Sequence, residues 1–187
     1  MTAPDIIKSI SPLPDSSMLR LAGQLEEINC PKGTCILKAG NVERSVFFVR
    51  KGIVRAFIEH GGREITFWFG LEGAAVVSLK SYVNGQPGYE TVECLEDTSL
   101  YVLRRDALEK LFLEDINIAN WGRKFAEIEF LSTEEKFIPM LFTTASERYR
   151  DLLKNRPELL QRVSLECLAS YLGITAQSLS RIRAGIR

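Results

Sequence analysis

Six short runs rich in β-branched and aromatic residues lie between Thr34 and Leu103, and turn-forming residues separate them. The runs cover residues 34–37, 45–49, 52–58, 64–69, 90–94 and 99–103. The pair Gly61-Gly62 joins two of them and is typical of a tight hairpin. Regular short strands with glycine and proline turns between them are typical of an antiparallel sandwich or barrel. The sequence therefore predicts a β unit over this stretch.

Helical patterns flank the β unit on both sides. Residues 16–27 predict a short helix before it, and Asp106 and Asp115 are candidate N-caps of two helices after it. Pro139 near the end of the second helix predicts either a hinge or a simple helix end.

The second of these helices carries an apolar stripe that must be buried. Ile118, Trp121, Phe125 and Ile128 recur at three- and four-residue intervals, the near-heptad spacing of a two-helix seam. We expect these four residues to contact a second copy of the chain, while Phe130 and Phe137 face the β unit. The alternative is that the whole stripe packs inside one subunit.

The stretch from Ser164 to Arg183 predicts two short helices joined by a tight turn at Gly173. Ser164 and Thr175 are candidate N-caps, and apolar residues follow each at helical spacing. Such a pair is a helix-turn-helix, whose second helix enters the major groove of DNA. The alternative is an ordinary helical hairpin that closes a core.

If the pair reads DNA, one face of its second helix carries the contacts. Gln177 can pair with adenine and Arg181 with guanine, and Ala176 can touch a thymine methyl group. Serine hydroxyls and further arginines suit phosphates. The expected DNA-binding residues are Thr175, Ala176, Gln177, Ser178, Ser180, Arg181 and Arg183. In the supporting helix before them, the candidate phosphate contacts are Arg148, Arg150, Lys154 and Arg162.

The segment PKGTCILKAGNVERSVFFVRKGIVRAFI (residues 31–58) resembles the opening of a cyclic-nucleotide-binding β-roll of the catabolite-activator/FNR family of bacterial transcription regulators. The resemblance continues through LEDTSLYVL (95–103) to the helix-turn-helix. It implies an α+β fold with an N-terminal antiparallel β-roll sensor over residues 1–112. A long dimerisation helix over 113–142 and an all-α DNA-binding domain over 143–187 would follow. The implied partners are double-stranded DNA and a second copy in a homodimer.

The family holds its nucleotide in a Gly-Glu-Leu…Arg-Ser/Thr pattern, in which the arginine pairs with the cyclic phosphate. Counted from Gly73, Ser78 stands at the glutamate position, Gly88 at the arginine position and Tyr89 at the following hydroxyl position. We therefore expect that cyclic AMP is not bound in the usual way, unless the alignment slips and Lys80 substitutes as the cation. The effector is another small molecule or none. The expected pocket residues are Val77, Ser78, Leu79, Gly88, Tyr89 and Glu90.

Family members usually continue into a β-hairpin wing, whereas this sequence stops at Arg187. The resemblance thus implies a wingless reader whose DNA affinity is lower or depends more on dimerisation.

Charge and composition narrow the function classes. Eight basic and four acidic residues follow Ser146, a net charge of +4, which leaves −4 on the rest of the chain. One histidine and four scattered cysteines offer neither a metal site nor a catalytic base, so an enzyme on a cupin-like barrel is disfavoured. No membrane span or signal peptide is evident, so a cytoplasmic protein is expected. The remaining rival is a ligand-binding module whose C-terminal helices only pack.

Overall fold

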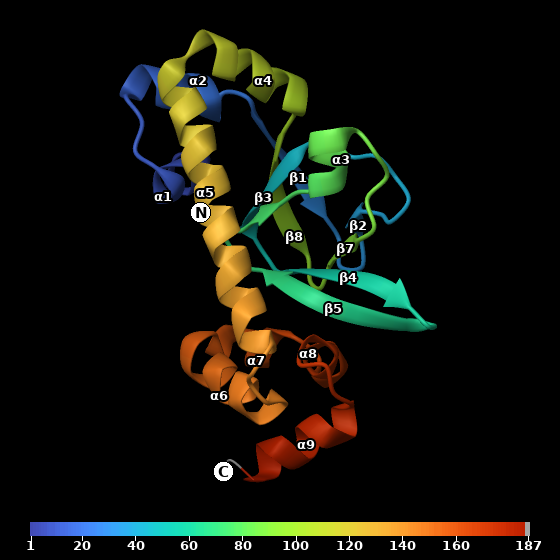
Figure 1. Cartoon of the computed structure of the whole chain (residues 1–187). Helices are drawn as coiled ribbons and strands as arrows, with labels where there is room; N and C mark the ends of the chain where they lie inside the picture. Colours follow the sequence, from blue (N-terminus) through green and yellow to red (C-terminus); the bar gives the residue numbers. More distant parts are fainter. Residues whose placement is uncertain (186–187) are drawn as a thin grey trace.

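The computed structural model describes residues 1–185, and its β-roll consists of two antiparallel sheets (Figure 1). Within these residues one sheet has the strand order β1-β8-β3-β6 and the other the order β2-β7-β4-β5. The strands are β1 (Leu25–Cys30), β2 (Cys35–Leu37), β3 (Val46–Lys51), β4 (Val54–His60), β5 (Arg63–Gly70), β6 (Ala75–Val76), β7 (Thr91–Cys94) and β8 (Thr98–Leu103). The predicted antiparallel β unit is confirmed, including the hairpin at Gly61-Gly62, where both residues have positive φ.

The helix before the β-roll is shorter than predicted. The short helix expected over residues 16–27 is α2 (Asp15–Ala22), and from Leu25 onward the chain is strand β1. Leu25 pairs with Leu103 of β8, so backbone pairing overrides the local helical spacing. A further helix, α1 (Ala3–Ile10), begins at a capping box between Thr2 and Asp5.

The C-terminal part is helical, as expected, and α5 runs from the β-roll to the last helices (Figure 1). The helices are α3 (Leu79–Asn84), α4 (Arg105–Glu114), α5 (Ile116–Met140), α6 (Ala145–Asn155), α7 (Pro157–Arg162), α8 (Leu165–Tyr171) and α9 (Ala176–Gly185). Asp115 caps α5 through its side chain, and Pro139 lies in the last turn of that helix. None of the described helices is both long and apolar enough to cross a membrane. The predicted end of the chain at Arg187, with its missing wing, lies outside the described residues.

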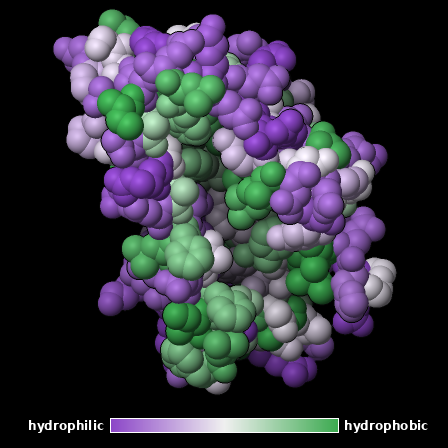
Figure 2. Space-filling view, turned by 45° about the horizontal axis from the view of Figure 1, so that its top comes forward, coloured by the Kyte–Doolittle hydropathy of each residue, from purple (hydrophilic) through white to green (hydrophobic). Residues whose placement is uncertain are grey.

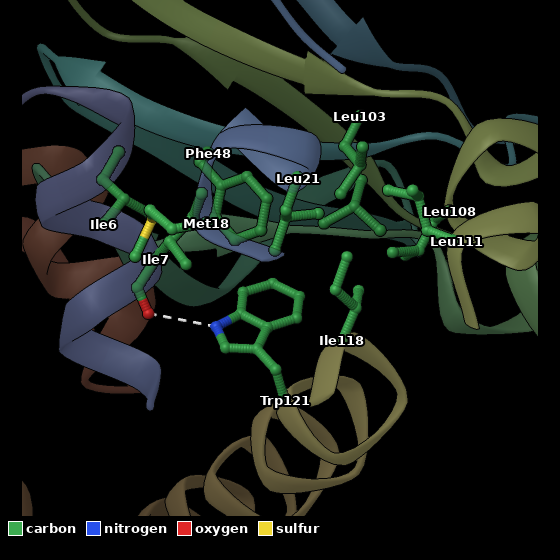
Figure 3. Close-up of a cluster of buried hydrophobic side chains, with 11 residues drawn as sticks. Ile6, Ile7, Met18, Leu21, Phe48, Leu103, Leu108, Leu111, Ile118 and Trp121 are labelled. Atoms are coloured by element: carbon green, nitrogen blue, oxygen red, sulfur yellow. Dashed lines mark hydrogen bonds between the residues drawn. The ribbon is translucent and has the colours of Figure 1, made fainter. Parts of the chain in front are cut away.

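A buried cluster under α5 joins the helix to the N-terminal segment (Figure 3). Trp121 lies at its centre, and its indole Nε1 donates a hydrogen bond of 3.0 Å to the carbonyl oxygen of Ile7. The Trp121 ring stacks on Phe125 at a centroid distance of 5.8 Å, and Phe125 in turn contacts Phe48 of β3. The first half of α5 is thereby fixed to the β-roll and α1 of the same protomer.

This packing differs from the predicted use of the α5 faces. Ile118 and Trp121 are 0% and 2% exposed, so their side chains are covered within the protomer and cannot form the expected seam with a second copy. Phe125 and Ile128 are half-buried. The other stripe is exposed instead: Phe130 and Phe137, expected to face the β unit, are 68% and 60% exposed. The sequence shows apolar residues on both sides of the helix, and the tertiary packing selects which side lies inward.

Candidate nucleic-acid interface and effector cassette

Helices α8 and α9 form a helix-turn-helix held by local caps and a shared core. The Ser164 hydroxyl accepts the backbone N–H of Cys167 at the start of α8, and Thr175 caps α9 by accepting the N–H of Ser178. Between them Gly173 has a φ of +70°, a conformation that a side chain would strain. The inner faces are apolar and buried, through Leu168, Ala169, Leu172 and Leu179. The second helix therefore has a fixed rotation, which decides which residues it presents.

Four of the seven predicted DNA-binding residues lie on the outer face of α9. Gln177, Ser180, Arg181 and Arg183 are exposed, and none of their side chains makes a hydrogen bond or salt bridge within residues 1–185. An exposed amide and two exposed guanidinium groups on one short helix leave their donors free for an external partner.

The other three predicted residues have local roles. Thr175 is exposed and acts as the N-cap of α9, and its hydroxyl lies 3.0 Å from the Ser178 hydroxyl, which is half-buried. Ala176 is half-buried and packs against the core of the helix-turn-helix. These positions therefore shape the start of α9.

Two of the four basic residues predicted as phosphate contacts are engaged inside the protein. Arg148 donates to the carbonyl oxygens of Thr143 and Leu172, at 2.6 and 2.8 Å, and so ties the start of α6 to the end of α8. Arg162 pairs with carboxylates of the β-roll, as described below. Arg150 and Lys154 are exposed and form no ion pair within residues 1–185.

Arg162 fastens the C-terminal helices to two turns of the β-roll. Its guanidinium binds Glu72 through two hydrogen bonds of 2.9 and 3.1 Å, and it binds Glu96 at 2.5 Å. Glu72 also accepts the backbone N–H of Gly52. The hydrogen bonds from Arg162, above all, lower the pKa of the Glu72 carboxyl from 4.5 to about 2. A bidentate pair of this kind sets geometry as well as affinity.

A second set of contacts joins α8 to the edge strand β5. The Ser170 hydroxyl donates to the carbonyl oxygen of Glu64 and accepts the N–H of Thr66, at 2.8 and 2.9 Å. The ring of Tyr171 packs on Phe69 at 5.2 Å between centroids. Ser170 thus occupies backbone groups that an edge strand would otherwise leave open.

Arg55 lies behind this contact and is buried. It pairs with Glu64 and Glu93 at 2.5 and 2.6 Å and donates to the sulfur of Cys167 on α8 at 3.4 Å. The internal contacts of Arg55 and Arg162 could not be predicted from sequence, because the partner residues are 9 to 112 positions away and follow no local pattern.

The predicted effector residues all lie in the connection between β6 and β7. We call these six residues the cassette: Val77, Ser78, Leu79, Gly88, Tyr89 and Glu90. Ser78, Gly88 and Glu90 are buried, whereas Leu79 and Tyr89 are exposed. A Cβ atom added to Gly88 would lie 2.5 Å from the Ser78 hydroxyl oxygen and 3.3 Å from a carboxylate oxygen of Glu90. The glutamate and arginine positions of the family pattern are therefore adjacent in space. Two small residues, Ser78 and Gly88, occupy them, and the Glu90 carboxylate lies beside them. Lys80, the alternative cation, is exposed on α3.

The cassette charge is opposite to what a phosphate needs. Glu90 places a carboxylate beside Gly88, and it forms no salt bridge within residues 1–185. Two like charges about 4 Å apart repel by about 4 kcal/mol at the effective dielectric constant of a protein surface. An anion at this position would be repelled by the Glu90 carboxylate, whereas the family pattern places an attracting arginine there.

The chain is similar to known proteins in both a sequence-family match and its fold. Residues 27–115 match the family model described as cyclic nucleotide-binding domain. A search of curated proteins by sequence found no match.

Solved structures match over most of the chain. FixK2 from Bradyrhizobium japonicum is 24% identical, with 87% of this chain and 84% of that chain covered at a TM-score of 0.69. The c-di-GMP responsive global regulator CLP of Xanthomonas campestris is 17% identical, with coverages of 92% and 91% and a TM-score of 0.72. The catabolite activator protein of Thermus thermophilus is 20% identical, with coverages of 95% and 85% and a TM-score of 0.59.

These similarities cover 87% to 95% of this chain, and so include most of the elements described above. Residues 27–115 thus match the model of the cyclic nucleotide-binding domain, and the chain as a whole shares the fold of these solved regulators, which are of the catabolite-activator/FNR type.

Proposed function

We propose that this protein is a cytoplasmic, homodimeric transcription regulator that binds double-stranded DNA through α9. Residues 1–112 are the β-roll sensor domain, 113–142 the dimerisation helix and 143–187 the DNA-binding domain. The fold shared with CLP, a protein described as a global regulator, supports this assignment. The dimer brings two copies of α9 to one duplex.

The observation that carries the proposal is the contrast between the two faces of α9. Its inner face is anchored by Leu179, which is fully buried, while Gln177 and Arg181 extend into solvent four residues apart. Residues at i and i+4 lie on the same side of a helix, so both side chains can reach the same groove. Glutamine and arginine are the side chains that pair bidentately with adenine and guanine.

The exposed side of α5 supports the dimer. We define the outer stripe as Phe130, Leu131, Phe137, Ile138 and Leu141, all of which are 49–68% exposed. Phe130 and Phe137, like Leu131 and Ile138, are seven residues apart, the repeat of a two-helix seam. Figure 2 shows hydrophobic residues gathered toward the lower end of that face of the molecule, in the region where α5 ends. Contiguous exposed apolar surface of this kind marks an interaction site, and the heptad spacing favours a second α5 as the occupant.

The inner side of the same half of α5 is polar, which strengthens this argument. Glu129 and Lys136 face the protomer, and the Lys136 ammonium lies 6.0 Å from the centroid of the Trp68 ring in β5. Burial raises the pKa of the Glu129 carboxyl and lowers the pKa of the Lys136 ammonium. A helix that covers charged groups and exposes aromatic ones is arranged for a partner on its outer side.

The test is equilibrium binding of the purified protein to a library of duplexes, measured over a range of salt concentrations. We expect salt-dependent binding to a palindromic site whose half-sites are about one helical turn (~34 Å) apart. Arg181→Ala and Gln177→Ala should each cost about 1–3 kcal/mol and relax specificity at one position of each half-site. Lys8→Ala removes one positive charge from α1, which lies away from α9 beside the first half of α5, and serves as the matched control (Figure 1).

Two results would change the assignment. A loss of affinity that is uniform across all sequences would make Arg181 a phosphate contact. Absence of any salt-dependent duplex binding would leave a ligand-binding β-roll module with no DNA-binding role.

A further inference from the structure

The cassette satisfies its own polar groups. The Ser78 hydroxyl donates to the Ser81 hydroxyl at 3.2 Å, and Ser81 donates to the carbonyl oxygen of Gln86 at 2.8 Å. Ser78 and Ser81 are both buried. These bonds close the loop upon itself across α3.

The backbone amides of the loop are also engaged. The N–H of Gly88 donates to the carbonyl oxygen of Asn41 at 2.9 Å, and the N–H of Gly40 donates back to the carbonyl oxygen of Gly88 at 2.9 Å. The N–H of Tyr89 donates to a carboxylate oxygen of Glu90 at 3.1 Å. Amides of this loop are the groups that an anion entering the cassette would need as donors.

We propose that the Glu90 carboxylate is an internal anion that occupies the place a cyclic phosphate would take, so that the cassette is closed without a bound nucleotide. The Glu90 carboxylate accepts the N–H of Tyr89, the residue after the arginine position of the pattern. It also lies 3.3 Å from the point where a Cβ atom of residue 88 would be. No arginine or lysine within residues 1–185 forms an ion pair with it. The same carboxylate therefore accepts the hydrogen bond that the loop amide donates, and it repels any further anion.

This inference goes beyond the proposed function, since it concerns the β-roll alone and makes the regulator independent of cyclic nucleotides. Its test uses no DNA, so failure of DNA binding and failure of this inference are distinguishable.

The first experiment is calorimetric titration of three full-length proteins with cyclic AMP. The wild type should show no saturable binding up to millimolar concentration. The double variant Ser78→Glu/Gly88→Arg restores the family pair, but its new guanidinium would be neutralised by Glu90. Adding Glu90→Ala to that double variant should then tighten cyclic AMP binding by at least about tenfold, because the arginine is freed for a charge-assisted pair with the phosphate. Saturable binding by the wild type, or equal binding by the double and triple variants, overturns the proposal.

A second measurement does not depend on the folding of those variants. Hydrogen exchange at the Tyr89 amide should be slow in the wild type and at least about tenfold faster in Glu90→Ala, because its acceptor is removed. Glu59→Ala, which removes an exposed carboxylate from the β4–β5 hairpin, is the control and should leave the Tyr89 rate unchanged. An unchanged rate in Glu90→Ala would show that the carboxylate does not hold this amide, and would refute its role as the internal anion.

Discussion

The two halves of α5 have similar apolar content but opposite relations to the protein. In the first half, Trp121 and Ile118 are buried against α1, α2, α4 and β3, while in the second half Phe130 and Phe137 are exposed. In the second half the charged residues Glu129 and Lys136 take the inward positions. The first half of the helix is thus part of the protomer core, and the second half carries the exposed stripe that we propose to contact a second copy.

The largest expected effect tests the first half. Trp121→Ala removes a fully packed ring and its hydrogen bond to Ile7, and should lower the free energy of unfolding by about 3–5 kcal/mol. Urea denaturation, followed at a protein concentration where the chain is monomeric, measures the change. Phe130→Ala, which truncates an aromatic ring of the exposed half, should change the monomer by only about 0.5 kcal/mol. Equal losses from the two substitutions would erase the distinction between the halves.

An intermediate effect tests the second half. The double substitution Phe130→Ser/Phe137→Ser removes both rings of the outer stripe and should weaken dimerisation by about 2 kcal/mol or more, roughly thirtyfold in Kd. Sedimentation equilibrium measures the dissociation constant. Leu113→Ser, at a 90% exposed apolar position on α4 outside the stripe, is the control and should leave the dimer intact. A monomeric wild type, or a double variant that dimerises normally, would refute the proposed role of the outer stripe.

The weakest effects are expected in the pH dependence of the melting temperature. Burial raises the folded-state pKa of Glu129 above 4.5, so its ionisation opposes folding at neutral pH, and this cost disappears as the pH falls through the folded-state pKa toward 4.5. Glu129→Gln should therefore raise the melting temperature at pH 7, with a gain that fades toward pH 4.5. Glu134→Gln, at an exposed position of the same helix, should leave it unchanged.

For Glu72 we expect the opposite change in melting temperature. Its folded-state pKa lies at about 2, below the reference value of 4.5, so its pairing with Arg162 contributes stability that is present above pH 4.5 and is lost as the pH falls toward 2. Glu72→Gln should thus lower the melting temperature at pH 7 and make the acid decline of stability less steep. Thermal melts of Glu129→Gln and Glu72→Gln between pH 7 and pH 3 check both predictions. If the two substitutions changed the melting temperature at pH 7 in the same direction, the opposing effects of burial and pairing would be contradicted.

Local chemistry explains why the helix-turn-helix could be predicted from sequence. Ser164 and Thr175 cap their helices through their own hydroxyls, and Gly173 adopts the positive φ that its turn requires. Such signals lie within a few residues of the element they define. The β-roll was predictable for a similar reason, because its turns are marked by glycine and its strands by β-branched and aromatic residues.

Other features depend on contacts between distant parts of the chain. Arg148 and Arg162 have the same sequence character as Arg150, yet two of them are bound to internal acceptors and one is exposed. The family pattern grouped Ser78, Gly88 and Glu90 as expected pocket residues, but only the structure shows that the Glu90 carboxylate lies beside the Gly88 position.

Local sequence signals were sufficient to predict the antiparallel β unit with its hairpin, the caps and turn of the helix-turn-helix and the exposed positions of Gln177 and Arg181 on α9. Contacts between distant segments fix which side of α5 is buried, which arginines bind internal acceptors and which side chains fill the cassette. The reason is physical: periodicity and turn chemistry report that a stripe or a charge requires a partner, whereas the identity of that partner is fixed by segments far apart in the chain.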